Sequence, residues 1–206
     1  MKELIILCNG EPPSKQLLQK YISSAGFLIA ADGGGNIALD MDIRPDVVIG
    51  DLDSFRTDQS HPFKVIQQAD QETNDLEKAL SLAYEKGAAN VYILGATGQR
   101  LDHTLKNLSV LKQFNEQFNK LYMIDNFGTI QLLPSVFDQK IAVGSQISLF
   151  PLSGKVTGIT TSGLKYPLRD EALENGVRDG SSNEVIDNPV QITYRQGDLL
   201  LFVADA

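Results

Sequence analysis

Residues 47–54 read Val-Val-Ile-Gly-Asp-Leu-Asp-Ser, a short apolar run that ends in a glycine and two aspartates. A continuous run of branched apolar residues is typical of a strand buried on both faces of a parallel sheet. Asp51 and Asp53 follow directly, and alternate residues of an extended segment point the same way, which would pair their carboxylates. The stretch therefore predicts a buried parallel strand whose carboxyl end carries acidic groups.

Similar apolar runs recur through the first half of the chain, at residues 4–8, 27–31, 91–94 and 121–124, with a weaker one at 65–66. Between them, residues 75–86 place leucines and alanines on one helical face, and Gly87 follows as a stop signal. Residues 103–119 carry leucines and phenylalanines at helical spacing and predict a second helix. Strand, helix and strand at these lengths predict an α/β fold with a doubly wound, mostly parallel sheet.

The pattern changes after about residue 128, where short strand-like runs are separated by glycine and proline with little helix. Strands are predicted at 129–133, 146–150, 156–161, 185–187, 190–194 and 199–204, and residues 195–198 are expected to form a hairpin turn between the last two. We therefore expect an α/β domain over residues 1–128 and a smaller all-β domain over 129–206.

Composition excludes several classes of protein. Apolar residues make up 42% of the 206, enough for a sizeable core, and the net charge of −8 argues against a nucleic-acid partner. No apolar stretch approaches the ~20 residues of a membrane span. The amino terminus is too short for a signal peptide, and Cys8 is the single cysteine. These features predict a cytoplasmic protein without a membrane partner.

Acidic residues follow the strands of the first half. In an open parallel sheet the carboxyl ends of the strands share one edge, so separate loops bring the following aspartates to that edge: Asp32, Asp51, Asp53, Asp75 and Asp102. Converging carboxylates repel one another unless a cation lies among them, and Mg²⁺ bound jointly by carboxylates and phosphates is the common solution.

Glycine-rich loops at the same edge strengthen this interpretation. Gly33–Gly35 and Gly95–Gly98 would let backbone amides approach phosphate oxygens, and Arg100 could neutralise charge on a transferring phosphoryl group. The sequence therefore predicts a magnesium-dependent enzyme that transfers a phosphate-containing group from ATP, although neither a Walker loop nor a Gly-x-Gly-x-x-Gly motif is present.

Each element also fits a purely structural role. Asp-Gly-Gly is a common turn, Asp75 and Asp102 suit the first turn of a helix, and His103 is a reasonable first-turn residue. Only the gathering of these groups at one edge is left unexplained by those roles.

Six motifs, taken in order, resemble those of thiamine pyrophosphokinases and cover the chain from about residue 30 to its end. They are Ala-Asp-Gly-Gly at 31–34, Pro-Asp-Val-Val-Ile-Gly-Asp-Leu-Asp-Ser at 45–54, Asp-Gln-Glu-Thr-Asn-Asp at 70–75, Gly-Ala-Thr-Gly-Gln-Arg-Leu-Asp-His at 95–103 with Asn107, Gly-Leu-Lys-Tyr-Pro-Leu at 163–168 and Ser-Asn-Glu at 182–184. Asn74 stands where threonine is common in the family, and Gln99 stands where glycine is common.

This resemblance implies an α/β domain followed by a β-sandwich domain, and a homodimer with active sites at the subunit interface. It also implies the reaction, in which ATP and thiamine give thiamine diphosphate and AMP with Mg²⁺.

The resemblance further implies a role for each matching residue. Asp51, Asp53 and Asp75 would hold the metal, and together with Arg100 and Asp102 they would form the catalytic set. Binding of ATP would involve Asp32, Gly33, Gly34, Gly95, Gly98, Arg100 and His103. Binding of thiamine would involve Gln71, Asp102, Ser182 and Asn183, with Ser182 and Asn183 reaching in from the partner subunit. Asp75 and Asp102 both stay open as the general base.

Two other functions fit the same residues. One is an ATP-dependent pyrophosphokinase or kinase acting on another small heterocyclic alcohol, such as a pterin. The other is a non-catalytic sensor of thiamine or nucleotide, against which the full set of acidic residues argues, because a sensor has no need of a metal cluster.

Overall fold

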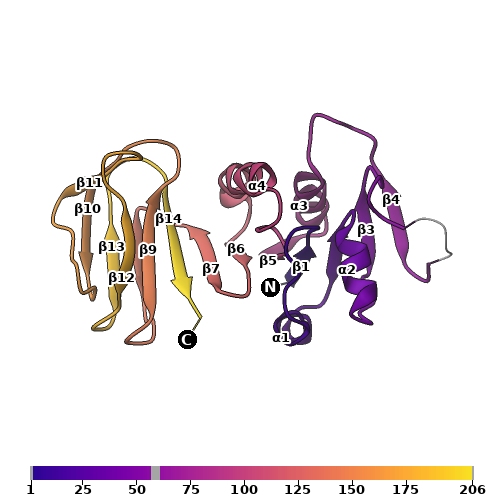
Figure 1. Cartoon of the computed structure of the whole chain (residues 1–206), viewed down its shortest axis with the longest axis horizontal. Helices are drawn as coiled ribbons and strands as arrows, with labels where there is room; N and C mark the ends of the chain where they lie inside the picture. The colour runs from indigo at the N-terminus through magenta and orange to yellow at the C-terminus, as the bar shows by residue number, and fades with distance from the viewer. Residues whose placement is uncertain (1, 57–60, 206) are drawn as a thin grey trace. The chain divides into compact units, whose positions relative to one another are not determined.

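The computed structural model describes residues 2–56 and 61–205, and the chain divides into two compact units, Met1–Asn126 and Phe127–Ala206. The first unit is built around a parallel sheet, and the second is built from antiparallel strands (Figure 1). The predicted combination of a doubly wound α/β domain and a smaller β-sandwich domain is confirmed. Within the described ranges, no helix is long and apolar enough to span a membrane.

In residues 2–56 and 61–126, six parallel strands form the sheet of the first unit, in the order β6-β5-β1-β2-β3-β4. Their bounds are β1 (Lys2–Leu7), β2 (Leu28–Ala31), β3 (Val47–Gly50), β4 (Lys64–Gln67), β5 (Ala88–Leu94) and β6 (Lys120–Ile124). The chain runs outward from β1 to β4, then returns to add β5 and β6 on the other side of β1. This reversal beside β1 is the point where open α/β sheets bind ligands, at the carboxyl ends of the strands.

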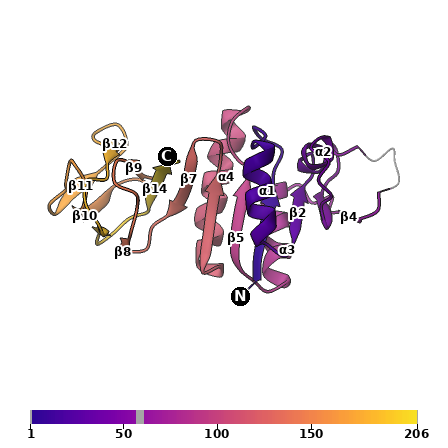
Figure 2. The same cartoon turned by 90° about the horizontal axis from the view of Figure 1, so that it is seen from below.

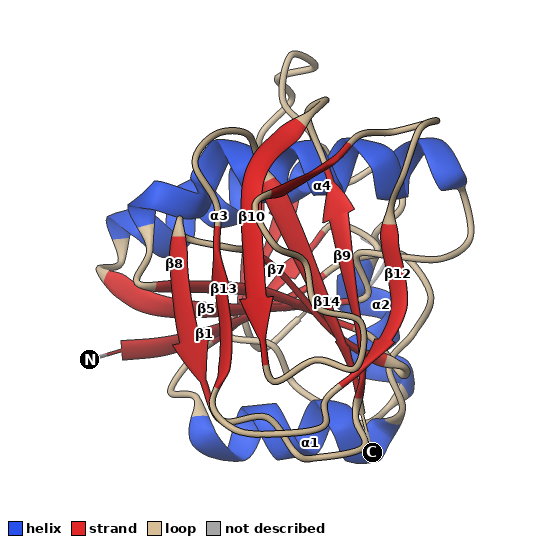
Figure 3. Cartoon of the chain, turned by 90° about the vertical axis from the view of Figure 1, so that its left-hand side faces the viewer, coloured by secondary structure: helices blue, strands red, loops and turns tan. Residues whose placement is uncertain are grey.

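Helices cover both faces of this sheet. Helices α1 (Lys15–Ser24) and α2 (Gly34–Asp40) lie against one face, where Leu18 and Ala38 join one buried cluster. Helices α3 (Asp75–Glu85) and α4 (Leu101–Phe114) lie against the other face (Figure 3). Figure 2 shows α1 lying in front of the parallel strands and running along them.

Helix α3 follows its prediction closely because its start is well specified. The side chain of Asn74 accepts a hydrogen bond from the backbone N–H of Glu77, and the side chain of Glu77 accepts one from the N–H of Asn74. This reciprocal capping box fixes Asp75 as the first helical residue. The second predicted helix begins two residues earlier than expected, at Leu101, and gives way to a 3₁₀ turn at Asn115–Gln117.

The second unit contains two four-stranded antiparallel arrays, β12-β9-β14-β7 and β11-β10-β13-β8. Their bounds are β7 (Gly128–Leu132), β8 (Val136–Gln139), β9 (Gln146–Pro151), β10 (Val156–Ser162), β11 (Glu171–Leu173), β12 (Gly180–Glu184), β13 (Val190–Thr193) and β14 (Leu199–Ala204). Side chains from both arrays, including Ile147, Ile159 and Ile192, form one core in which each is fully buried. Burial of such side chains stabilises the fold by roughly 1.5–3 kcal/mol each.

Two details predicted for this unit are wrong. Residues 195–198 do not form a hairpin, because β13 pairs with β8 and β10 whereas β14 pairs with β7 and β9. The turn instead carries the chain from one sheet to the other. The strand expected at 185–187 lies earlier, at Gly180–Glu184, and Val185 only forms an isolated bridge with Leu164.

Candidate active site

A cavity of 520 Å³ opens at the carboxyl ends of the parallel strands. Its lining comes from the segments that follow β1, β2, β3 and β5, from the first turn of α3 and from the first two turns of α4. This is the edge at which the sequence predicted the acidic groups to meet. Residues from all of these segments are needed to form it, so the fold of the first unit creates the cavity.

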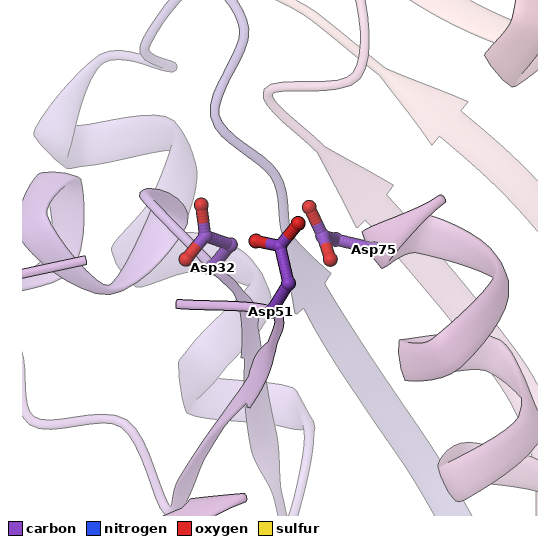
Figure 4. Close-up of side chains that lie close together, drawn as sticks. All are labelled: Asp32, Asp51 and Asp75. Carbon is purple, nitrogen blue, oxygen red and sulfur yellow. The ribbon is translucent and has the colours of Figure 1, made fainter. Parts of the chain in front are cut away.

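Three carboxylates meet in this cavity. One oxygen each of Asp32, Asp51 and Asp75 lies within 4.8 Å of the others, and Figure 4 shows their side chains converging from three segments. Oxygen ligands in this number suit a hard divalent cation. We call these three residues the acidic cluster.

Asp32 is the buried member of the acidic cluster, with 3% of its surface exposed. Burial and then the charge of Asp75 raise the pKa of this carboxyl, against the lowering effect of hydrogen bonds from Ser54 and Gly33. The N–H groups of Ser54 and Phe55 donate to its two oxygens at 3.1 and 3.2 Å. Its backbone is also held at φ 44°, an uncommon conformation for a residue other than glycine. Crowded negative charge and a constrained backbone fit a site that receives a cation.

Asp53 lies apart from the cluster although it lines the same cavity. The sequence argument assumed an extended segment, but Leu52 adopts φ 67°, which turns the chain between the two aspartates. The N–H of Asp53 donates to Oδ1 of Asp51 at 3.2 Å, and its carboxylate accepts from Ser54 Oγ at 2.9 Å. Asp32 thus takes the place beside Asp51 that the spacing suggested for Asp53.

Gln71 lies beside the cluster, with Nε2 donating to Oδ2 of Asp51 at 3.3 Å. It comes from the loop before α3. Its amide can therefore orient the Asp51 carboxylate.

The loop from Gly95 to Gly98 forms another wall of the cavity, and both glycines have positive φ values of 67° and 78°. Gln99 also has a positive φ, of 51°, which explains why glycine would suit that position. Its side chain turns to the neighbouring loop, where Nε2 donates to the carbonyl oxygen of Gly10 at 2.7 Å.

Asn9 and Gly10 also line the cavity, and the sequence analysis missed them. The N–H of Gly10 donates to the carbonyl oxygen of Gly95 at 2.7 Å, and a Cβ at Gly10 would lie only 2.5 Å from the carbonyl oxygens of Gly95 and Thr97. The signal was available, because Asn9 and Gly10 follow β1 as Asp32 follows β2.

Gly33 and Gly34 are buried and are not among the residues that line the cavity. A Cβ on Gly34 would lie 2.1 Å from the carbonyl oxygen of Leu7. Their small size therefore lets the start of α2 pack against the end of β1.

Arg100 and His103 line the cavity, whereas Asp102 does not. Arg100 forms a two-point hydrogen bond to Asp102, from Nε at 3.1 Å and from a terminal nitrogen at 2.6 Å. This hydrogen bonding, together with the positive charge, lowers the pKa of Asp102. Both side chains are well exposed, so the pair can open to meet a ligand.

Lys106 and Asn107 of α4 complete this wall, and Lys106 was not predicted. Lys106 Nζ lies 3.0 Å from Glu77, while Asn107 Nδ2 donates to the carbonyl oxygen of Ala96 at 2.8 Å. Lys106 could have been found from its helical spacing, since it lies three residues after His103 on the same helix face.

Ser182 and Asn183 lie in the second unit, on β12. Ser182 is exposed with φ 58°. Asn183 is 8% exposed, and its side chain accepts from the N–H of Tyr166 at 3.0 Å and donates to the carbonyl oxygen of Tyr166 at 2.8 Å. Asn183 thereby fixes the backbone of Tyr166. Tyr166 itself is 63% exposed.

Models of two protein domains match this chain. Residues 18–123 match the model described as "Thiamin pyrophosphokinase, catalytic domain", and residues 136–199 match "Thiamin pyrophosphokinase, vitamin B1 binding domain".

Whole proteins match over nearly the full chain. The thiamine pyrophosphokinase of Bacillus subtilis is 30% identical, over 98% of this chain and 98% of its own, and thiamin pyrophosphokinase 1 of Caenorhabditis elegans is 27% identical, over 96% of this chain and 86% of its own.

Solved structures agree. The crystal structure of the Bacillus subtilis enzyme superposes with a TM-score of 0.86 at 29% identity, covering 98% of this chain and 99% of the other. Thiamin pyrophosphokinase from Geobacillus thermodenitrificans gives a TM-score of 0.85 at 25% identity, covering 99% and 98%.

Proposed function

The chain belongs to the thiamine pyrophosphokinase family, and from this premise we propose which of its residues carry out the reaction. It is an enzyme that transfers the diphosphate of ATP to the hydroxyl of thiamine, giving thiamine diphosphate and AMP. The observation that supports our assignment most is the acidic cluster at the carboxyl edge of the sheet, next to the Gly95–Gly98 loop.

We assign Mg²⁺ to Asp51 and Asp75 together with Asp32, and place Asp53 beside them as a further acidic group of the cavity. The fit rests on the three convergent oxygens and on the raised pKa of Asp32, since a carboxyl crowded by negative charge gains from a cation. When bound, Mg²⁺ would neutralise phosphate charge. Gln71 would hold Asp51 in orientation through its 3.3 Å hydrogen bond.

The phosphates of ATP would lie against Gly95 and Gly98, which line the cavity without a side chain in the way of a phosphate oxygen. Arg100, His103 and Lys106 supply the nearby donors of positive charge or hydrogen bonds. Gly33 and Gly34 would contribute indirectly, by letting α2 pack closely enough to place Asp32.

Thiamine would be bound by Gln71 and Asp102 of one subunit and by Ser182 and Asn183 of a partner subunit, in a homodimer. Support comes from the position of Ser182 and Asn183 in the region that matches the vitamin B1 binding model. Asn183 would act by holding Tyr166, since both functional groups of its side chain are bonded to that backbone. The single cysteine, buried Cys8, suits a reducing cytoplasm.

The chemical step is in-line attack of the thiamine hydroxyl oxygen on the β-phosphorus, with AMP as the leaving group. Such transfers depend mainly on positioning and charge neutralisation. Asp102 does not line the cavity and its carboxylate is bonded to Arg100, so we assign Asp102 to orientation of thiamine and not to proton abstraction.

The direct test incubates purified protein with ATP, thiamine and Mg²⁺ and separates the products by chromatography. We expect equal amounts of AMP and thiamine diphosphate, with both abolished by EDTA. ADP with thiamine monophosphate would reveal a simple kinase, and binding of both substrates without turnover would support a sensor. Competition by other heterocyclic alcohols, such as pterins, tests the substrate.

Shared active sites in a homodimer can be tested by complementation. We expect Asp51→Asn and Ser182→Trp each to be inactive alone, and a co-expressed mixture to regain activity, because a mixed dimer contains one site with neither change. Absence of any recovery in a mixture shown to contain mixed dimers would contradict the shared site.

A further inference from the structure

Lys78 is the only lysine or arginine that is buried among the residues the structure describes. It lies on α3, one turn after Asp75, and its side chain is 4% exposed. A buried ammonium group is strongly unfavourable unless a partner of opposite charge compensates it. The burial of Lys78 must therefore be explained by the groups that its ammonium contacts.

The partner of Lys78 is a member of the acidic cluster. Lys78 Nζ lies 3.1 Å from Oδ1 of Asp75, whose own side chain is 32% exposed. Asp75 lines the cavity and Lys78 does not, so Lys78 approaches Asp75 from the side that faces away from the cavity. A carboxylate offers acceptor sites on both oxygens, which leaves Oδ2 of Asp75 for a ligand in the cavity.

The other positive groups nearby are engaged elsewhere. Lys106 is paired with Glu77, and Arg100 is paired with Asp102. Lys78 is not paired with the other nearby carboxylate, Asp70. The pKa of Asp70 is lowered mainly by hydrogen bonds from Thr73 and Glu72, and Lys78 contributes least. Among the residues that the structure describes, Lys78 is thus the cation directly bonded to the acidic cluster.

We propose that Lys78 is a positioning residue that acts as the resident counter-charge of Asp32, Asp51 and Asp75, keeping the cluster assembled before a divalent cation arrives. The formal charge of the three carboxylates is −3, and Lys78 brings it to −3 + 1 = −2, which one divalent cation neutralises. This inference rests on the metal site proposed above, and it adds a role for a residue outside the cavity.

The test measures thermal unfolding and Mn²⁺ binding of nucleotide-free protein at pH 8. Lys78→Met should lower the melting temperature without metal, and Mn²⁺ should raise it more than in the wild type, because the cation replaces the missing charge. Calorimetry should show Mn²⁺ binding at least about tenfold tighter in this variant, since the site is more negative. Lys78→Arg should behave like the wild type.

Two controls separate counter-charge from simple packing. Glu77→Gln removes the other buried charge of α3, outside the cluster, and should lower the melting temperature equally with and without Mn²⁺. The double variant Asp75→Asn/Lys78→Met should recover much of the metal-free stability that Lys78→Met loses, because the unpaired charge is gone. This double variant also keeps the test decisive if Lys78→Met alone does not fold.

Each outcome bears on a different step of the inference. An Mn²⁺ shift in Lys78→Met equal to or smaller than that of the wild type would overturn the role of Lys78 while leaving the metal site intact. A wild type that shows no Mn²⁺ shift and no binding would overturn the three-carboxylate site itself. Asp51→Asn, which should lose the shift, identifies the cluster as the place of binding.

Discussion

Asn74 donates a hydrogen bond from its side-chain amide to Oδ1 of Asn107 at 3.0 Å, which joins the start of α3 to α4. The same Asn107 donates to the carbonyl oxygen of Ala96 in the glycine-rich loop. Asn74 also caps α3 and precedes Asp75. One pair of amides therefore links the loop proposed for phosphate to the helix that places a metal ligand.

Two substitutions of Asn74 separate its role as the cap of α3 from its hydrogen bond to Asn107. Asn74→Ala should lose both the cap and the link and destabilise the protein by about 1–2 kcal/mol in urea unfolding. Asn74→Ser should keep the cap and most of the stability, but its short side chain cannot reach Asn107, so the apparent KM for ATP should rise. Equal KM values for Asn74→Ser and the wild type would show that the link is dispensable for ATP binding.

The acidic cluster predicts an order among the aspartate variants. Asp51→Asn should reduce kcat by orders of magnitude with an unchanged circular dichroism spectrum, because the cluster loses a charged ligand. Asp53→Asn should reduce it less, since Asp53 lies outside the cluster. Asp42→Asn, whose side chain is 93% exposed, is the control and should keep full activity. A larger loss for Asp53 than for Asp51 would contradict the assignment.

The parallel sheet and its acidic edge could be predicted because short apolar runs and the residues after them carry that information locally. The sequence predicted that the carboxylates of Asp51 and Asp53 pair, and in the structure they do not. The left-handed backbone of Leu52, which separates them, cannot be recognised from the residue type. Only contacts with other segments hold that conformation, and these appear once the chain is folded.

Long-range partners explain the other differences. Residues 195–198 have the composition of a hairpin turn, but a turn does not specify which sheet the next strand joins. The burial of Lys78 was equally hidden, since a lysine one turn into a helix is usually solvated. In both cases the outcome depends on surfaces contributed by distant parts of the sequence.

Gly10 tests the missed loop after β1. Gly10→Ala places a Cβ 2.5 Å from two carbonyl oxygens, so the loop or the Gly95–Gly98 segment must move. We expect a loss of about 1–3 kcal/mol in stability and a clear fall in kcat/KM for ATP. Gly26→Ala is the matched control, because a Cβ there meets nothing within 4 Å. If the two variants behave alike, the close approach at Gly10 does not constrain the site.

Cys8 gives a prediction about pH. Burial, and then the negative charge of Asp75, raise the pKa of this thiol from 9.0 to about 12. In the unfolded chain the thiol ionises near its ordinary value, so between about pH 9 and 12 the unfolded state binds fewer protons than the folded state. Stability must therefore fall as pH rises through this window, by up to about 1.4 kcal/mol per pH unit.

Other groups titrate in the same range, so the measurement is a difference between wild type and Cys8→Ala. Urea unfolding at pH 8 and pH 10 should show a steeper loss for the wild type, by about 1 kcal/mol. Iodoacetamide should label Cys8 in unfolded protein at pH 8 and leave the folded protein almost unmodified, because the buried thiol does not ionise. Rapid labelling of the folded protein, or parallel pH dependence in the two proteins, would mean that burial does not keep the Cys8 thiol protonated.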